Sequence, residues 1–285
     1  MSVVVTGATG HLGRLVVESL LERGLPTEEI TATGRDTTKL ADLAERGVIT
    51  TRADFDDPAC LRAAFAGADT LLLVSGSEVG KRVPQHRNAI EAAKEAGVGH
   101  LVYTSVLRAD RSTLSLAPEH KATEQILAES GLPHTLLRNG FYSEVFSTQV
   151  DQAREQGAFV GSAGQGRVSS ASRRDYAEAA AVVLLDPAAH VGVVHELVGD
   201  QAWTYADLAV AIGEVLGREV AYENLSEEDH RATLIGVGLD EATTGFVVGI
   251  DTGIREGELW AEPGLLAKLI GRPTTPIVET LRAQA

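Results

Sequence analysis

The sequence is poor in cysteine and in basic charge. Cys60 is its only cysteine, so the chain forms neither an intrachain disulfide nor a cysteine-rich metal site, and a reducing compartment is expected. Lysine and arginine number 25 against 40 acidic residues, and the resulting net charge of −15 argues against general binding to nucleic acid or anionic membranes. No apolar run approaches the roughly 20 residues that cross a bilayer, and residues 1–6 lack the basic region of a signal peptide. We therefore expect a cytoplasmic protein.

What the sequence does contain is an alternation of short apolar runs with longer segments of helical period. This pattern, in 285 residues of which 44% are hydrophobic, predicts an α/β fold with a doubly wound parallel (Rossmann) sheet. The predicted strands are 3–6, 30–33, a third before Asp54, 71–74, 100–104, 135–138 and 193–198. The predicted helices are 12–23, 39–46, 87–96, 119–129, 176–185 and 205–216.

The regular alternation ends after Phe141. Residues 157–166 contain four glycines, and glycines recur through residues 236–257, a pattern that predicts short elements forming a cap. We expect residues 1–150 to form a nucleotide-binding domain to which residues 172–200 return. Residues 151–171 and 201–285 are then a smaller α/β cap on the substrate side.

A glycine-rich loop follows the first predicted strand. Its sequence, Thr6-Gly7-Ala8-Thr9-Gly10-His11-Leu12-Gly13, has glycines at the three positions of a GxxGxxG pattern. Gly7 permits the tight turn, Gly10 lets a pyrophosphate approach the backbone, and Gly13 lets the helix pack closely on the strand. The helix N-terminus offers unpaired N–H groups to phosphates. Although any strand-to-helix turn can use such glycines, their position in a first βαβ unit favours a dinucleotide site.

The end of the second strand indicates which dinucleotide. It reads Ala32-Thr33-Gly34-Arg35, and Arg35 lies 22 residues after Gly13. An arginine there pairs with the 2′-phosphate of NADP(H), which a carboxylate would repel. The alternatives are that Asp36 binds the ribose hydroxyls of NAD, or that Arg35 is a solvated surface residue. Asp54 is a candidate adenine contact, or else the cap of a helix that begins near Pro58.

Several further motifs carry a family resemblance. They are Ser75-Gly76-Ser77-Glu78-Val79-Gly80, Pro84-Gln85-His86-Arg87-Asn88, Tyr103-Thr104-Ser105, Leu136-Leu137-Arg138-Asn139-Gly140-Phe141-Tyr142 and Leu269-Ile270-Gly271-Arg272-Pro273-Thr274. Together with the glycine loop, they make the chain similar to the NmrA-like, atypical short-chain dehydrogenase/reductase family, and most of all to its type-2 NAD(P)H:quinone oxidoreductase branch. The resemblance runs nearly from end to end.

The resemblance implies a set of NADP(H) contacts. They are Gly7, Ala8, Thr9, Gly10, His11, Leu12, Arg35, Ser75, Gly76, Ser77, Asn139, Gly140, Phe141, Tyr142, Ser143 and Glu144. Ser75 to Ser77 and Asn139 to Tyr142 directly follow predicted strands, which is where ligands bind in such sheets. Asn139, Phe141 and Tyr142 are also the candidate substrate contacts. The alternative is an asparagine in a turn beside two core aromatic residues.

The catalytic acid of conventional short-chain dehydrogenases is missing. Those enzymes use a Tyr-x-x-x-Lys pair; here Lys121 is present, but Ala117 stands four residues before it. Tyr103 does not have that spacing, and Tyr142 is a substitute only by conjecture, so the catalytic residues are unknown. Lys121 is interpreted as a solvated helix residue. Ser105, near the usual catalytic serine position, is expected to orient a ligand or bond to backbone.

The missing acid bears on the substrate. Reduction of an ordinary ketone benefits strongly from protonation of the developing alkoxide, whereas a quinone becomes aromatic on accepting hydride, so its reduction depends less on a dedicated acid. The leading hypothesis is therefore an NADPH-dependent quinone reductase that uses neither flavin nor metal, and the histidines indeed lack ligand spacing. The alternatives are a reductase of triphenylmethane or azo dyes and an NADP(H)-sensing regulator. A homodimer is compatible with each.

Overall fold

The computed structural model describes residues 1–285 and divides them into two compact units. Unit 1 comprises Met1–Asp110, Leu116–Asn139 and Arg173–Leu197. Unit 2 comprises Arg111–Ser115, Gly140–Ser172 and Val198–Ala285. The chain thus passes into unit 2 after Asn139 and returns to unit 1 at Arg173, whereas the sequence analysis set these two points at residues 150 and 172.

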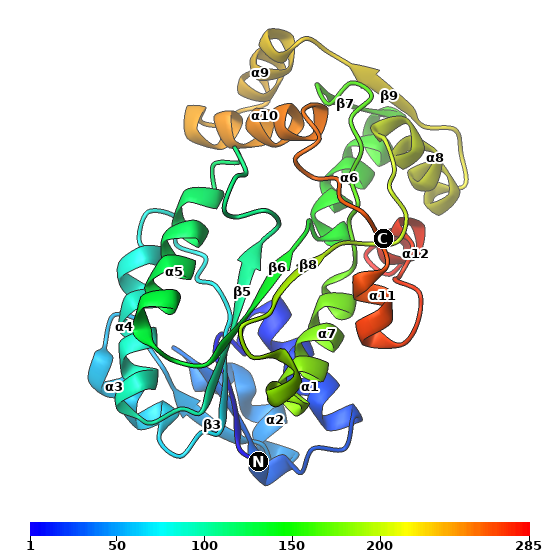
Figure 1. Ribbon diagram of the computed structural model, residues 1–285. Coiled ribbons are helices and arrows are strands. Elements are labelled where there is room, and N and C mark those ends of the chain that lie inside the picture. Colours follow the sequence, from blue (N-terminus) through cyan, green and yellow to red (C-terminus); the bar gives the residue numbers. More distant parts are fainter. The chain divides into compact units, whose positions relative to one another are not determined.

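Unit 1 alternates strands and helices along the chain (Figure 1). Its strands are β1 Val3–Val5, β2 Ile30–Gly34, β3 Ile49–Arg52, β4 Thr70–Leu73, β5 His100–Val106, β6 His134–Asn139 and β8 Val194–Leu197. Its α-helices are α1 His11–Glu22, α2 Ala41–Glu45, α3 Pro58–Phe65, α4 Arg82–Glu95, α5 Ala117–Ser130 and α7 Arg173–Leu185. Three short 3-10 turns are η1 Thr27–Glu29, η2 Thr37–Leu40 and η4 Pro187–His190.

The seven strands of unit 1 form one sheet in the order β3-β2-β1-β4-β5-β6-β8, and every neighbouring pair is parallel. The chain order reverses beside β1, as in a doubly wound sheet. Helices α3, α4 and α5 cover one face, while α1 and α7 pack together on the other (Figure 1). The predicted fold class is confirmed.

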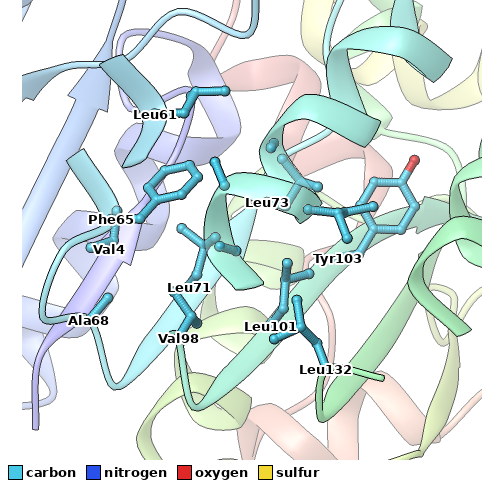
Figure 2. Packing of buried hydrophobic residues seen from close by; sticks show 14 of the residues in the cluster. Val4, Leu61, Phe65, Ala68, Leu71, Leu73, Val98, Leu101, Tyr103 and Leu132 are labelled. Atoms are coloured by element: carbon cyan, nitrogen blue, oxygen red, sulfur yellow. The ribbon is translucent and has the colours of Figure 1, made fainter. Parts of the chain in front are cut away.

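The core between the sheet and helices α3 to α5 is almost entirely aliphatic. Leu71 and Leu73 of β4, Leu101 of β5 and Phe65 of α3 have no exposed surface (Figure 2). Strands buried on both faces read as continuous apolar runs, and for this reason the Leu71–Leu73 run could be identified in the sequence. Tyr103 of β5 is also fully buried, with its hydroxyl 2.8 Å from Nδ1 of His120 on α5.

Unit 2 contains the remaining elements. They are η3 Ser143–Phe146, α6 Ser147–Gln156, β7 Ala158–Gly161, α8 Tyr205–Leu216, β9 Ala221–Asn224, α9 Glu227–Gly236, α10 Glu241–Arg255, α11 Leu265–Ile270 and α12 Ile277–Arg282. Strands β7 and β9 pair in parallel as a separate two-stranded sheet. The core of this unit is aromatic: Phe146 lies edge-on to Trp203, with their ring centroids 4.7 Å apart.

A buried carboxylate joins three helices of unit 2 and the loop that follows β7. Asp251 of α10 accepts a hydrogen bond of 2.6 Å from the backbone N–H of Ser162 and another of 2.6 Å from the Tyr205 hydroxyl. Nδ1 of His230, on α9, lies 3.4 Å from the same carboxylate. Burial raises the pKa of Asp251, and these bonds satisfy a group that would otherwise be costly to bury.

The sequence predicted most of the strands and helices of unit 1 and few of those of unit 2. All seven strands of the large sheet were expected, and the predicted bounds of α8, 205–216, are those observed. Strands β7 and β9 and helices α6 and α9 to α12 were not predicted as such. The four glycines of residues 157–166 in fact surround β7, since Gly157 ends α6 with a φ of 77° and Gly161 ends the strand. No helix of the chain combines the length and apolar character that a bilayer crossing needs.

Two buried histidines make the stability of unit 1 sensitive to acid. Burial lowers the pKa of His86 from 6.5 to about 4 and that of His120 to about 3, with Arg82 adding to both shifts. The unfolded chain takes up a proton at each ring below pH 6.5, and the folded protein does not until near pH 4. The contribution of these two histidines to the free energy of unfolding is therefore complete above pH 6.5 and is lost as the pH falls towards 4.

We predict that His86→Gln, which keeps a hydrogen-bonding side chain but does not titrate, loses less stability on acidification than the wild type. Between neutral pH and a pH of about 5 the difference should reach about 2 kcal/mol. Urea unfolding of both proteins at the two pH values measures it, and other titrating groups cancel in the comparison. Equal losses in the two proteins would contradict the assignment.

Candidate functional site

The carboxyl ends of the strands in unit 1 bring most of the predicted site residues to one edge of the sheet. The register pairs Val5 of β1 with Ala32 of β2 and with Leu72 of β4, so the loops that follow these three strands start side by side. The glycine loop, Arg35 and Ser75 to Ser77 occupy these loops. Val106 of β5 pairs with Asn139 of β6, which places Asn139 at the same edge.

The glycine loop has the tight geometry that its sequence predicts. Gly7 has a φ of 62°, and its carbonyl accepts a hydrogen bond of 2.9 Å from Gly10 N–H. A Cβ at Gly13 would lie 2.5 Å from the Gly7 carbonyl oxygen, and one at Gly10 would lie 3.3 Å from it. Helix α1 therefore begins directly against the backbone of the loop, and Gly13 tolerates no side chain.

The N-terminus of α1 has no partner from the protein's own side chains. Gly10 is its N-cap without a side-chain hydrogen bond, and the first turn holds no acidic residue. Some helices of the chain are capped by side chains, such as α3 by Asp57 and α8 by the capping box of Thr204 and Asp207, whereas α4, α5 and α6, like α1, have no side-chain cap. An uncapped helix of twelve residues that follows a glycine loop offers unpaired N–H groups and the positive end of the helix dipole, which are features that suit a phosphate group.

The loop after β4 is held in place by buried polar side chains. The Thr6 hydroxyl accepts from Val74 N–H at 2.9 Å, and the Thr104 hydroxyl accepts from Ser75 N–H at 2.9 Å. The Gly76 carbonyl accepts from Nε of Arg82 at 2.6 Å, and Gly76 N–H donates to Nε2 of His86 at 2.9 Å. These bonds leave the Ser75–Ser77 backbone in a defined position beside the glycine loop.

His86 has a fixed tautomer. Its Nε2 accepts from Gly76 N–H, and its Nδ1 lies 2.9 Å from the Thr123 hydroxyl. That hydroxyl donates to the Glu119 carbonyl at 2.9 Å, so Nδ1 of His86 is the donor to Thr123. The ring is therefore neutral, in agreement with its lowered pKa. His86 is a packing residue that positions the Ser75–Ser77 loop.

Arg35 lies next to the glycine loop. Gly34, which precedes it, packs so closely on Thr9 that a Cβ at Gly34 would lie 2.4 Å from the Thr9 methyl group. The Arg35 guanidinium is largely exposed and pairs with Glu78 at 2.8 Å. The carboxylate of Asp36 accepts from the Thr38 hydroxyl at 2.6 Å and caps η2, so it serves the local backbone.

Asp54 does not cap the helix that follows it. Its carboxylate accepts from Asp56 N–H at 3.2 Å and from the Arg52 guanidinium at 2.9 Å. The residue that caps α3 is Asp57, whose side chain accepts from Cys60 N–H at 3.0 Å. The alternative interpretation of Asp54 as a helix cap is therefore wrong. The neighbouring Phe55 ring lies edge-on to His86, with centroids 6.1 Å apart, so this loop contacts helix α4.

Asn139 ends β6 with a buried amide whose oxygen has no hydrogen-bond partner. Only 4% of the residue is exposed. A buried polar atom without a partner is costly, and a ligand that donates a hydrogen bond would remove that cost. This orphaned oxygen, the uncapped α1 and the glycine cradle fit a dinucleotide coenzyme.

The remaining predicted contacts, Gly140 to Glu144, belong to unit 2. Phe141 and Phe146 have ring centroids 5.9 Å apart, and the Phe141 carbonyl accepts from Ala171 N–H at 3.2 Å. Ser143 N–H donates to the Ala171 carbonyl at 2.9 Å. This segment is therefore an ordered part of unit 2, with Tyr142 in a parallel bridge to Ala171.

The position of the conventional catalytic set is occupied by a structural network. Ala117 starts α5, and Nζ of Lys121 donates to the Asp110 carbonyl at 2.9 Å. The Ser105 hydroxyl donates to Glu124 at 2.6 Å. Glu124 also forms a two-bond ion pair with Arg138, with a closest distance of 2.6 Å.

The contacts of Ser105 and Tyr103 can now be compared with what the sequence predicted for them. Ser105 bonds to a side chain rather than to backbone. The fully buried Tyr103, whose pKa burial raises, is no proton donor for a ligand. Trp203 is a core residue of unit 2, with its indole N–H donating to the Ser170 hydroxyl at 3.1 Å.

Sequence reasoning did not find the roles of Glu78, Lys81 and Arg82. Glu78 pairs with Arg35 at 2.8 Å and with Lys81 at 3.0 Å, and Nη1 of Arg82 lies 3.6 Å from Glu119. The Glu78–Lys81 pair has an i,i+3 spacing that a charge-pattern search can recognise. The pairing of Glu78 with Arg35 joins residues far apart in the chain and depends on the fold.

The chain is similar in sequence and structure to several known proteins. The model of the NmrA-like family matches residues 1–251. Quinone oxidoreductase 2 of Escherichia coli (strain K12) is 47% identical over 98% of this chain and 97% of its own length. The crystal structure of an NADPH-dependent quinone oxidoreductase from E. coli in complex with NADPH has a TM-score of 0.94 and 46% identity, covering 99% of both chains. The Citrobacter sp. triphenylmethane reductase complexed with NADP(H) has a TM-score of 0.93 and 36% identity, covering 100% of both chains.

We predict that Gly13→Ala lowers the affinity for NADPH at least about tenfold and destabilises the protein by about 1–3 kcal/mol, because its Cβ collides with backbone rather than with a movable side chain. The matched control is Gly249→Ala, which lies inside α10 with open space around its Cβ position. That control should leave binding unchanged and add about 0.5–1 kcal/mol of helix stability.

Thermal unfolding and titration calorimetry with NADPH measure both variants. The interpretation of the glycine loop is wrong if Gly13→Ala behaves like Gly249→Ala.

Proposed function

Because this chain belongs to the NmrA-like family, to which its sequence match and its 47% identical relative assign it, we propose that it is an NADPH-dependent reductase that transfers a hydride directly to a quinone-type acceptor. The observation that carries the proposal is the 47% identity to a quinone oxidoreductase over nearly the whole of both chains. In this proposal the enzyme works without flavin or metal and acts in the cytoplasm, and a homodimer is compatible with it. Its single cysteine, Cys60, supports a reducing compartment.

The chain's own residues bind the coenzyme at the edge of the large sheet. Between Gly7 and Leu12, the N–H groups of Ala8 and Gly10 already donate to the carbonyls of Thr33 and Gly7. The other N–H groups of this segment, with the uncapped N-terminus of α1, receive the pyrophosphate. Arg35 binds the 2′-phosphate, and Asp54 lies on the adenine side. Ser75 to Ser77 contribute a backbone fixed by Thr104 and His86. NADPH supplies the hydride when it is bound.

Asn139 orients the redox end of the site. Its buried and unpartnered amide oxygen accepts a hydrogen bond from the nicotinamide carboxamide or from a donor on the substrate. The neighbouring segment Gly140 to Glu144 provides further contacts, with Phe141 and Tyr142 offering flat faces to an aromatic acceptor. Binding in a defined orientation, with water excluded, is the main catalytic contribution of the protein.

The side chains around Ser105 are already hydrogen-bonded to one another, and this favours an electron-poor acceptor that needs no acid from them. The Ser105 hydroxyl donates to Glu124, the Tyr103 hydroxyl is buried against His120, and Ala117 replaces the usual tyrosine. No group from this set can protonate a developing alkoxide. A quinone spreads the incoming charge over a ring that becomes aromatic, so its reduction is compatible with a site without that acid.

We predict that the purified protein, without added flavin or metal, consumes NADPH in the presence of benzoquinone or naphthoquinone. The loss of NADPH absorbance under steady-state conditions measures this activity. The same assay with triphenylmethane and azo dyes tests the second candidate function, which the TM-score of 0.93 to a triphenylmethane reductase favours. Tight binding of NADPH with no turnover of any acceptor would instead indicate a sensor of the coenzyme.

The coenzyme preference depends on Arg35. We predict that Arg35→Ala weakens NADPH binding at least about tenfold, because it removes a charge-assisted contact to the 2′-phosphate, and changes NADH binding by no more than about twofold. Calorimetric titration of both coenzymes measures the difference. Equal weakening of the two would remove the basis for assigning the 2′-phosphate to Arg35.

A further inference from the structure

Two cations of unit 1 converge on a single carboxylate beside the glycine loop. Nη1 of Arg35 lies 2.8 Å from Oε1 of Glu78, and Nζ of Lys81 lies 3.0 Å from Oε2 of the same residue. Each oxygen of Glu78 thus serves one cation. The hydrogen bond and charge of Lys81, followed by the charge of Arg35, lower the pKa of Glu78, so the carboxylate is ionised at neutral pH.

The position of this trio follows from the sheet order. Arg35 directly follows β2, while Glu78 and Lys81 lie in the connection between β4 and α4. Strands β2 and β4 are the two neighbours of β1, and the glycine loop leaves the carboxyl end of β1. The ion pair between Arg35 and Glu78 therefore bridges the two loops that flank the glycine loop. Gly34 touches Thr9, which places the base of Arg35 against that loop.

We propose that Glu78 occupies, in the free protein, the anion position on Arg35 that the 2′-phosphate of NADPH takes, and that it thereby tunes the preference between the two coenzymes. The proposal rests on the proposed assignment of the 2′-phosphate to Arg35. A phosphate offers more negative charge and more acceptor oxygens than a carboxylate, so it replaces Glu78 on the guanidinium. NADH has no group that can do so, and it leaves the pair in place.

Lys81 lowers the cost of this exchange. When Arg35 turns to the phosphate, Glu78 keeps its second cation and is not left as an unpaired charge next to the incoming anion. The side chains of Arg35 and Lys81 are 67% and 65% exposed. An ion pair with that exposure contributes little to folding stability, so it can open without disturbing the loop. In this scheme Glu78 weakens NADPH binding, and Lys81 moderates the effect of Glu78.

Four variants test the exchange by calorimetry with NADPH and NADH at low ionic strength. Glu78→Gln should bind NADPH at least about threefold more tightly than the wild type and NADH within about twofold of it. Lys81→Met should weaken NADPH binding, and the double variant Glu78→Gln/Lys81→Met should match Glu78→Gln alone. In the Arg35→Ala background, Glu78→Gln should have a clearly smaller effect, because the competition for the guanidinium is gone and only the repulsion between Glu78 and the phosphate remains.

The control for net charge is Glu45→Gln, an exposed residue of α2 with the same change of charge. It should change neither affinity. The proposal is overturned if Glu78→Gln leaves NADPH affinity unchanged, if it strengthens NADH to the same extent, or if its effect is undiminished in the Arg35→Ala background. A double variant that binds NADPH more weakly than Glu78→Gln would overturn the indirect role of Lys81.

These measurements use binding alone, so they are independent of the acceptor. If the wild type binds NADPH but reduces no quinone, the proposed reaction fails while the exchange at Arg35 can still be observed. If quinones are reduced and Glu78→Gln behaves like Glu45→Gln, the reaction stands and the role of Glu78 is rejected.

Discussion

The close approach of helix α1 to the backbone of the glycine loop is the constraint on which the rest of unit 1 depends. The space at Gly13 ends at the Gly7 carbonyl oxygen, 2.5 Å from where a Cβ would stand. That contact points the start of the helix at the carboxyl edge of the sheet and leaves its first N–H groups without side-chain partners. Arg35, the Ser75–Ser77 loop and Asn139 lie at the same edge. The contact between α1 and the glycine loop therefore determines where the helix N-terminus lies relative to these candidate nucleotide contacts.

Buried hydrogen bonds give the loop after β4 the rigidity that the glycine loop obtains from backbone packing. Gly76 is held on one side by Arg82 and on the other by His86, whose neutral ring is locked through Thr123. These hydrogen bonds offset the cost of burying the polar groups that make them, while Nη1 of Arg82 is left with only the ion pair to Glu119 at 3.6 Å. The same bonds join α4 and α5 to the loop, and the packing of these helices thereby determines where the loop lies.

The sequence predicted those features that arise from local patterns. Apolar runs identified the strands, since a strand buried on both faces such as Leu71–Leu73 has no polar alternation. The glycines identified the loop, and the basic residue after β2 indicated the coenzyme. Strands β7 and β9 escaped prediction because four residues each, paired across some sixty residues of chain, carry little periodic signal. Asp57 rather than Asp54 caps α3, a distinction that only the direction of each carboxylate decides.

The side chains around Ser105 form a hydrogen-bonded network at the position where conventional short-chain dehydrogenases have their acid–base residues. In place of a tyrosine and a free serine there is a carboxylate, Glu124, that accepts from Ser105 and pairs with the half-buried Arg138. Arg138 in turn reaches Glu196 on β8 at 2.9 Å, and the other oxygen of Glu196 accepts from Arg108 N–H at 2.9 Å. These bonds tie β5, β6 and β8 together at their carboxyl ends.

The network around Arg138 therefore strengthens the platform that holds Asn139 while it removes the hydroxyl from acid–base work. Such a site contributes to catalysis mainly by holding the coenzyme and the acceptor in a fixed orientation. Positioning alone suffices for an acceptor that stabilises its own negative charge, and it does not suffice for a simple ketone.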